Sequence, residues 1–170
     1  MNIILIGYMG CGKSTIGNNI SKILNKNFVD LDTYIELNEN LSISEIFKTK
    51  GEVYFRKIEA KHLKDLLSSN SDTVISLGGG TPCYSNNIKL INSFKSIYLN
   101  CPVSILSKRL LNIKSTRPVI SNINNLSEMT NFVGKHLFER NVFYNKAHFK
   151  IDCNELNVEQ ITNKVLSILS

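Results

Sequence analysis

A phosphate-binding loop lies at the start of the chain, where residues 7–14 read GYMGCGKS and fit the pattern G-x-x-x-x-G-K-[S/T]. The apolar residues 2–6 precede it and are short enough for a buried parallel strand, and residues 15–24 follow it with apolar side chains at helical spacing. Backbone N–H groups of such a strand, loop and helix, together with the positive helix end, surround phosphate oxygens. The motif in this context predicts a site for a nucleoside triphosphate within an α/β fold.

The residues of this loop are expected to have different roles. Lys13 would reach the β- and γ-phosphates, and Ser14 would ligate a magnesium ion. Cys11 stands at a variable position of the motif, where we expect a small filler rather than a reactive thiol. The loop residues predicted to contact the nucleotide are Gly10, Cys11, Gly12, Lys13, Ser14 and Thr15.

The composition is that of an ordinary globular chain. Its 170 residues suffice for one domain, residues 1–170, and 42% of them are hydrophobic. No apolar run approaches the roughly 18 residues of a membrane span, and no cationic leader precedes the first predicted strand, so we expect neither membrane attachment nor export. The four cysteines form no C-x-x-C pair and are typical of reduced thiols in the cytoplasm; they are Cys11, Cys83, Cys101 and Cys153.

The net charge of +6 favours anionic partners, which include both nucleic acids and small phosphorylated molecules. The chain has no long lysine or arginine block and no tryptophan, so we expect no nucleic-acid partner. The sequence contains no coiled-coil pattern and no large apolar excess, and we expect a monomer.

Apolar runs and helical stretches alternate along the chain. The predicted strands are residues 2–6, 28–32, 73–77, 96–99 and 147–151. The predicted helices are residues 15–24, 43–47, 52–67, 103–111, 126–145 and 158–169, and the polar residues 112–125 are predicted to form a mobile loop. This alternation favours a three-layer α/β/α fold with a five-stranded parallel sheet, whose ligands gather at the carboxyl ends of the strands.

Residues outside the phosphate loop narrow the class of reaction. The guanine-specifying pattern N-K-x-D is absent, since residues 145–148 read NKAH. Asp30 and Asp32 end the second predicted strand, where alternation would turn both side chains to the same side. One carboxylate would then face Mg²⁺ and the other an acceptor hydroxyl, which is typical of phosphoryl transfer to an alcohol.

Six segments together resemble the shikimate kinase family in order and spacing, from residue 1 to about residue 152. They are the phosphate loop, DLD at 30–32, GEVYFRKIE at 51–59, LGGGTP at 77–82, TRP at 116–118 and LFER at 137–140. The resemblance implies a P-loop kinase of the nucleoside monophosphate kinase-like fold, with sheet order 2-3-1-4-5. It also implies transfer of the γ-phosphoryl group of ATP to the 3-hydroxyl of shikimate, a step of aromatic amino-acid biosynthesis.

For the nucleotide, the resemblance implies that Lys13 contacts the transferred phosphoryl group and that Arg109 lies against the adenine. Arg117 would lie on a lid of about residues 112–125 and stabilise charge in the transition state after closure. One Mg²⁺ would be held by Ser14 and Asp30.

For the acceptor, the resemblance implies that Asp32 orients or deprotonates the 3-hydroxyl, while Arg56 and Arg140 clamp the carboxylate. Glu59, one helical turn after Arg56, would hold that arginine. The predicted shikimate-binding set is Asp32, Arg56, Gly78, Gly79, Gly80 and Arg140, with a substrate-binding segment of about residues 33–60. The predicted catalytic residues are Lys13, Asp32 and Arg117.

Two alternatives stay open at this point. The acceptor of a related kinase could be gluconate or a nucleoside monophosphate, although residues 33–60 form a short segment for a base pocket and residues 78–80 suit a compact ring. A non-catalytic, basic protein that binds ATP or nucleic acid is the alternative from another class. It predicts salt-dependent binding to nucleic acid and no acceptor-dependent release of ADP.

The chain departs from the family pattern at Val142 and His148, which we interpret as structural changes. Residues 154–157 contain no basic side chain that could approach the adenine. Tyr34 and Tyr144 are expected to be packing residues, and no role is assigned to the histidines.

Overall fold

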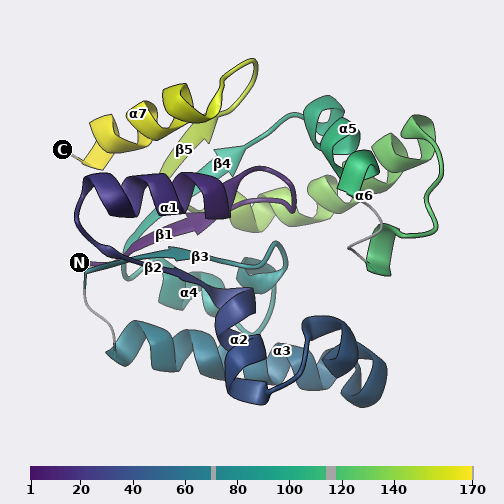
Figure 1. Cartoon of the computed structure of the whole chain (residues 1–170), viewed down its shortest axis with the longest axis horizontal. Coiled ribbons are helices and arrows are strands. Elements are labelled where there is room, and N and C mark those ends of the chain that lie inside the picture. The colour runs from purple at the N-terminus through teal and green to yellow at the C-terminus, as the bar shows by residue number, and fades with distance from the viewer. Residues whose placement is uncertain (70–71, 114–117, 170) are drawn as a thin grey trace.

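The centre of the molecule is a five-stranded parallel sheet. The computed structural model describes residues 1–69, 72–113 and 118–169. The strands are β1 (Ile3–Ile6), β2 (Asn27–Asp30), β3 (Thr73–Ser76), β4 (Lys95–Asn100) and β5 (Phe149–Asp152), in the order β2-β3-β1-β4-β5 (Figure 1). All neighbouring strands run parallel. The predicted fold class and strand order are confirmed.

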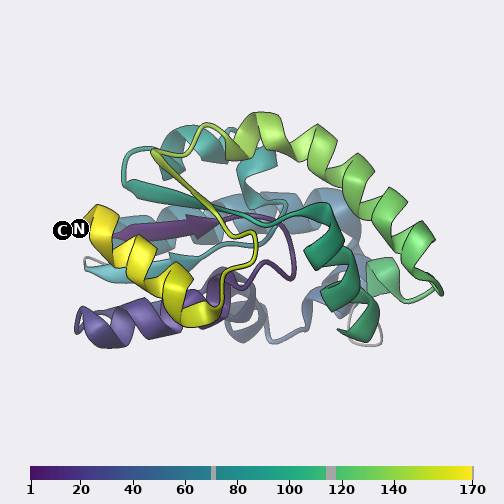
Figure 2. The same cartoon turned by 90° about the horizontal axis from the view of Figure 1, so that it is seen from above.

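Helices cover both faces of this sheet. They are α1 (Lys13–Ile23), α2 (Leu31–Glu39), α3 (Ile43–Ser69), α4 (Asn87–Ile91), α5 (Val103–Ile113), α6 (Leu126–Tyr144) and α7 (Val158–Leu169), with short 3₁₀ turns at η1 (Thr81–Cys83) and η3 (Pro118–Ile120). Figures 1 and 2 show α1 and α7 side by side over one face, while α4 and α6 lie over the other. Within the described residues, no helix is both long and apolar enough to cross a bilayer.

The core lies around the central strands. All residues of β1 and β3 are buried, which explains why these strands read as continuous runs rather than as alternating patterns. At Gly17 a Cβ atom would lie 2.5 Å from Cε2 of Phe28. Because a glycine stands there, α1 packs directly against the side chain of β2, and the loop before α1 is held close to the strand ends.

The second predicted strand was too long. β2 ends at Asp30, and α2 begins at Leu31, because the Asp30 side chain caps this helix by accepting hydrogen bonds from the backbone N–H groups of Asp32 and Thr33. Asp32 therefore lies in the first turn of a helix, and the argument that Asp30 and Asp32 share one face of a strand was wrong. Helices α2 and α4 were both missed; α2 buries only Leu31 and Ile35, so its apolar periodicity is weak.

The predicted helices 43–47 and 52–67 are the two arms of α3. Gly51, at φ 80° and ψ 171°, separates them with a conformation that a side chain would disfavour. Ser42 starts the first arm as a capping box, since its Oγ accepts from the backbone of Glu45 at 3.2 Å and its own N–H donates to Oε2 of Glu45 at 2.8 Å. Of the predicted loop 112–125, residues 112–113 end α5 and residues 118–120 form η3.

Candidate functional site

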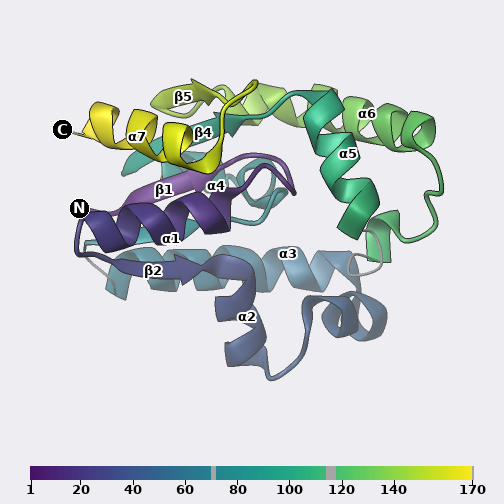
Figure 3. The ribbon, with the colours of Figure 1, turned by 45° about the horizontal axis from the view of Figure 1, so that its top comes forward.

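A cleft of about 610 Å³ opens at the carboxyl ends of the strands. Figure 3 shows the loop after β1, the start of α2 and the start of α5 gathered at this end of the sheet. The cleft is lined by Met9, Gly10, Gly12, Lys13, Ser14, Thr15, Phe28, Asp30, Asp32, Thr33, Ser76, Leu77, Gly78 and Gly79. Three segments that are far apart in the sequence therefore meet where a parallel sheet is expected to bind its ligands.

The phosphate loop joins β1 to α1 and ends at Gly12, which has φ 98° and stands at the N-cap of α1. Lys13 is only 8% exposed, and its Nζ donates to the carbonyl oxygens of Gly7 and Tyr8, both at 2.9 Å. The ammonium group is thereby held inside the curve of the loop. Cys11 is buried, and a Cβ atom at Gly7 would lie 3.0 Å from its Sγ, which supports the role of a small filler.

Oxygen ligands suitable for a magnesium ion lie next to the loop. The hydroxyl of Ser14 donates to Oδ2 of Asp30 at 2.6 Å and lies 3.4 Å from the hydroxyl of Ser76. Among the described residues no cluster of three or more His, Cys, Asp or Glu side chains could hold a metal. Mg²⁺ commonly uses one or two protein ligands and completes its shell with water and phosphate oxygens, so the pair fits this ion.

Sequence reasoning missed Ser76. It ends β3, a position at which the chain has a hydroxyl group rather than a carboxylate. Its side chain is buried and its hydroxyl faces Ser14, so a small neutral group lies next to the two predicted metal ligands. The parallel register that pairs Asp30 with Ser76 could have identified it, once the strand order was known.

The glycines after β3 allow charged groups to approach the backbone. A Cβ atom at Gly78 would lie 2.7 Å from Oδ1 of Asp32. A Cβ atom at Gly80 would lie 2.8 Å from both terminal nitrogens of Arg56. A Cβ atom at either position would displace the end of the Asp32 or the Arg56 side chain, so glycine lets both charged groups lie beside the backbone.

The second arginine approaches the same loop from α6. A Cβ atom at Gly79 would lie 3.7 Å from Nη1 of Arg140, whose guanidinium carbon lies 5.5 Å from the centre of the Tyr8 ring. The buried Tyr144 hydroxyl donates to the carbonyl oxygen of Gly79, so Tyr144 holds the loop in addition to its expected packing role. Burial raises the pKa of Tyr8 to about 12, against the lowering effect of Arg140, and this hydroxyl stays protonated.

Arg56 is held by the expected partner. Its Nη1 donates to Oε2 of Glu59 at 2.8 Å, and Oε1 of Glu59 accepts from the hydroxyl of Thr81 at 2.6 Å. Glu59 is 1% exposed, so this pair differs from an ordinary helix ion pair at the surface, which would contribute roughly 0.3–0.5 kcal/mol. Nε and Nη2 of Arg56 also donate to Oε1 of the exposed Glu52, each at 3.3 Å.

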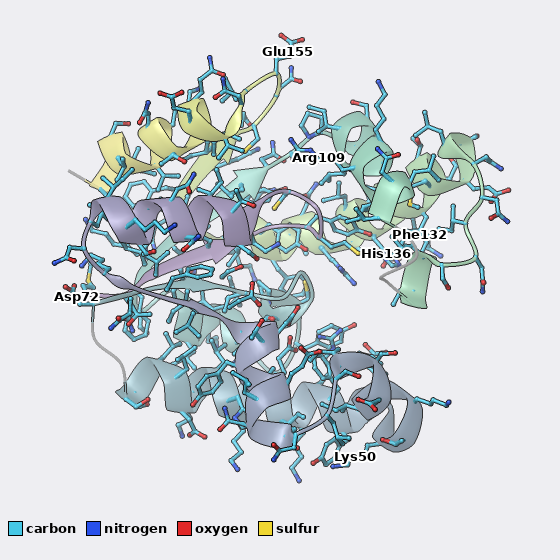
Figure 4. The ribbon with its side chains drawn as sticks, viewed as in Figure 1. Lys50, Asp72, Arg109, Phe132, His136 and Glu155 are labelled. Carbon is cyan, nitrogen blue, oxygen red and sulfur yellow. The ribbon has the colours of Figure 1, made fainter. Side chains whose placement is uncertain are left out.

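Two of the predicted nucleotide-binding residues remain, Arg109 and Arg117. Arg109 extends from α5, and its Nη1 donates to the carbonyl oxygen of Gly10 at 3.2 Å, which places it beside the phosphate loop (Figure 4). Arg117 lies outside the described residues. On α6, the ring centres of His136 and Phe132, both labelled in Figure 4, are 4.2 Å apart, and Nδ1 of His136 lies 3.1 Å from the Tyr8 hydroxyl.

The other histidines are structural. His148 stands where the family pattern has an acid, and its Nδ1 lies 2.9 Å from the hydroxyl of Ser96 on β4. His62 on α3 pairs with Oε1 of Glu39 on α2 at 2.9 Å. Both contacts tie neighbouring elements together, and neither histidine is among the residues that line the cleft.

Comparisons with known proteins agree with this geometry. The family model described as shikimate kinase matches residues 9–170. A shikimate kinase of Flavobacterium johnsoniae is 46% identical over 170 residues, covering 99% of this chain and 98% of that protein. A solved shikimate kinase from Bacteroides thetaiotaomicron has a TM-score of 0.92 at 33% identity and covers 99% of this chain and 98% of that chain.

A further solved structure is similar to this chain in sequence and in shape. It is the shikimate kinase of Acinetobacter baumannii in complex with shikimate, with a TM-score of 0.87 at 30% identity, covering 99% of this chain and 92% of that chain. The sheet order β2-β3-β1-β4-β5 is that of P-loop kinases of the nucleoside monophosphate kinase-like fold. Motifs, strand order and comparisons lead to one family, and the chain belongs to the shikimate kinases.

Proposed function

We propose that this protein transfers the γ-phosphoryl group of ATP to the 3-hydroxyl of shikimate, releasing ADP and shikimate 3-phosphate in aromatic amino-acid biosynthesis. The observation that carries this proposal is the convergence of one carboxylate and two guanidinium groups on residues 78–80, at the edge of a cleft that contains the phosphate loop. Shikimate has a carboxylate and a set of ring hydroxyls, which these groups complement. Membership of the shikimate kinase family supports the same reaction.

On the nucleotide side, backbone N–H groups of residues 7–14 and the N-terminus of α1 would bind the phosphates. Lys13 would exchange the loop carbonyls that it now contacts for phosphate oxygens, and so neutralise charge during transfer. Arg109 is the proposed neighbour of the adenine, because it already lies beside Gly10 at the mouth of the loop.

Ser14 and Asp30 would hold one Mg²⁺, since both present oxygen ligands at the phosphate end of the cleft. The positive charge held there would offset the negative charge of the phosphates during transfer. The short contact of Ser14 with Asp30 keeps the two protein ligands together before a nucleotide arrives.

On the acceptor side, Asp32 would orient the 3-hydroxyl and accept its proton, because its carboxylate lines the cleft between the phosphate loop and Gly78. Arg56 and Arg140 would bind the shikimate carboxylate through N–H donors of their guanidinium groups. Residues 33–60, within a single domain, would form the acceptor-binding segment. We further propose a cytoplasmic monomer without a nucleic-acid or membrane partner.

The test is ADP release from ATP with Mg²⁺, with shikimate, gluconate and nucleoside monophosphates offered separately. We expect release with shikimate alone. Release with gluconate or a monophosphate but not with shikimate would reject the proposed acceptor and the carboxylate clamp. If no acceptor causes ADP release and the protein binds nucleic acid in a salt-sensitive way, the non-catalytic alternative is favoured.

A matched pair of variants makes this assay specific for the clamp. Arg140→Ala should raise the KM for shikimate strongly and leave the KM for ATP near its starting value. The control is Lys135→Ala on the same helix, where the side chain is exposed. An unaltered KM for shikimate in Arg140→Ala would remove this arginine from the proposed site.

A further inference from the structure

Tyr84 lies next to Arg56 but belongs to none of the predicted sets. It follows η1 in the loop between the glycines and α4, and the centre of its ring is 4.1 Å from the guanidinium carbon of Arg56. The ring of Phe55 lies 5.0 Å from the same carbon. Two aromatic rings therefore pack against the cation, at distances where the attraction between a cation and an aromatic face is effective.

The backbone after Tyr84 is strained in a way that fixes this residue. Ser85 has φ 50° and Asn86 has φ 61°, so two consecutive residues with side chains occupy the left-handed region. Hydrogen bonds hold the turn at both ends, from the N–H of Asn87 to the carbonyl of Tyr84 at 2.9 Å and from the N–H of Cys83 to that of Gly80 at 2.9 Å. Strain of this kind persists only where the surrounding structure imposes it, and it is common at ligand sites.

The contact with the Tyr84 ring leaves the N–H donors of Arg56 free, whereas the contacts with Glu59 and Glu52 use some of them. A guanidinium group has five N–H donors, and the bonds to Glu59 and Glu52 use three of them. A ring face restrains the plane of the cation without accepting any N–H in that plane. Tyr84 can therefore hold Arg56 in place while donors remain for a further carboxylate.

Tyr84 also covers part of the Arg56 side chain. Tyr84 itself is 38% exposed, and it lines a hollow of about 610 Å³ together with Arg56, Val53 and Ser85. The Arg56 side chain itself is only 15% exposed. Removing the ring would admit water around the cation, which weakens its attraction for a bound anion.

We propose that Tyr84 is a positioning residue that sets the affinity of the site for the acceptor's carboxylate by holding Arg56 in a fixed plane. This inference rests on the proposed function, in which Arg56 binds that carboxylate. The hydroxyl group of Tyr84 has no part in it; only the ring face acts.

The test compares Tyr84→Leu, which removes the ring, with Tyr84→Phe, which keeps it. We expect Tyr84→Leu to raise the KM for shikimate about threefold to twentyfold, the range of a partly desolvated cation–π contact, with kcat and the KM for ATP within about twofold of the starting values. Tyr84→Phe should match the unmodified protein. Thermal unfolding of each variant verifies that it is folded, and Tyr84→Met serves as a second ring-free variant.

A neutral acceptor separates positioning from a general structural effect. For shikimate with its carboxylate replaced by a primary amide, removal of the Tyr84 ring should change the KM little, because the charge that Arg56 recognises is absent. Equal losses for the acid and the amide, or a Phe variant as impaired as the Leu variant, would overturn the role of Tyr84. If the unmodified protein does not phosphorylate shikimate, the proposed function fails first, before any comparison of variants.

Discussion

The phosphate region, residues 7–14, is one continuous segment, whereas the acceptor region takes its groups from four separate places, namely Asp32, Arg56, residues 78–80 and Arg140. In the phosphate region the loop backbone encloses Lys13, and the geometry follows from a local turn between a strand and a helix. In the acceptor region the positions depend on α2, α3 and α6 packing correctly around one loop. The residues that form the phosphate region are thus neighbours in the sequence, whereas those that form the acceptor region are far apart in it.

The phosphate region and the acceptor region should therefore respond differently to substitutions. A continuous loop keeps its shape while its own residues are intact, so substitutions there should change chemistry more than folding. An assembled region depends on buried pairs such as Arg56 with Glu59, and it should respond to changes that never touch a ligand. The following experiments test the separation, from the largest expected effect to the smallest.

Replacing Asp32 with alanine should separate the two regions. We expect Asp32→Ala to leave ATP binding nearly intact and to lower kcat by about 10²–10⁴-fold, the contribution typical of a positioned general base. Single-turnover transfer measures the loss, and calorimetric titration with ATP measures the binding. Unchanged turnover would reject the role of Asp32, and a parallel loss of ATP affinity would show that the regions are not separable.

Removing the buried partner of Arg56 should destabilise the fold and weaken the acceptor region together. Glu59→Gln replaces the charge that faces Arg56 and should lower the free energy of unfolding by about 1.5–3 kcal/mol, as for hydrogen bonds to charged groups. The control is Glu52→Gln, because Glu52 is 54% exposed and contacts the same arginine; we expect about 0–1 kcal/mol there. Denaturant unfolding compares the two, and equal effects would contradict the importance of burial.

A methyl group at position 80 should raise the KM for shikimate and leave the KM for ATP unchanged. Gly80→Ala would bring a Cβ atom 2.8 Å from both terminal nitrogens of Arg56, so the arginine must move and the KM for shikimate should rise severalfold. The KM for ATP should stay near its original value. Gly134→Ala in α6 is the matched control, since a Cβ atom there would meet no atom within 4 Å and should stabilise the helix by about 0.5–1 kcal/mol. A raised KM for both substrates would break the comparison.

The smallest expected effect concerns His136, which joins the two regions through its contact with Tyr8. Burial, and after it the charge of Arg140, lowers the pKa of His136 below its ordinary value of 6.5. Below pH 6.5 the unfolded chain therefore takes up a proton that the folded chain resists, and stability falls as the pH falls. His136→Gln should lose less Tm than the unmodified protein between pH 7 and pH 5. Measurements at pH 8, where the histidine is neutral in both states, isolate the change in hydrogen bonding.

The sequence allowed the phosphate region to be predicted, because all of its determinants are neighbours in the chain. The sheet order and the pairing of Arg56 with Glu59 were also predicted, through the resemblance and through helical spacing. The secondary structure around Asp32 was predicted wrongly. An apolar run followed by acids is typical of a strand that ends in acids, and equally of a strand followed by a helix that an acid caps. The capping interaction of Asp30 decides between them, and it is visible only in three dimensions.

Other parts of the site depend on contacts that no local pattern encodes. Tyr144 reaches Gly79 across 65 residues, and Ser14 meets Ser76 across 62 residues. Tyr84 is followed by a strained turn at Ser85 and Asn86, and although asparagine favours the left-handed conformation, serine gives no such signal. The contacts of these residues can be identified only once the three-dimensional structure is known.

Asp30 uses its two carboxylate oxygens for two different neighbours. Oδ2 accepts from the hydroxyl of Ser14, and Oδ1 accepts from the backbone of Asp32 and Thr33 at the start of α2. Because one carboxylate holds both neighbours, replacing Asp30 should disturb the contact with Ser14 and the start of α2 together, whereas replacing Asp32 should affect the acceptor end alone.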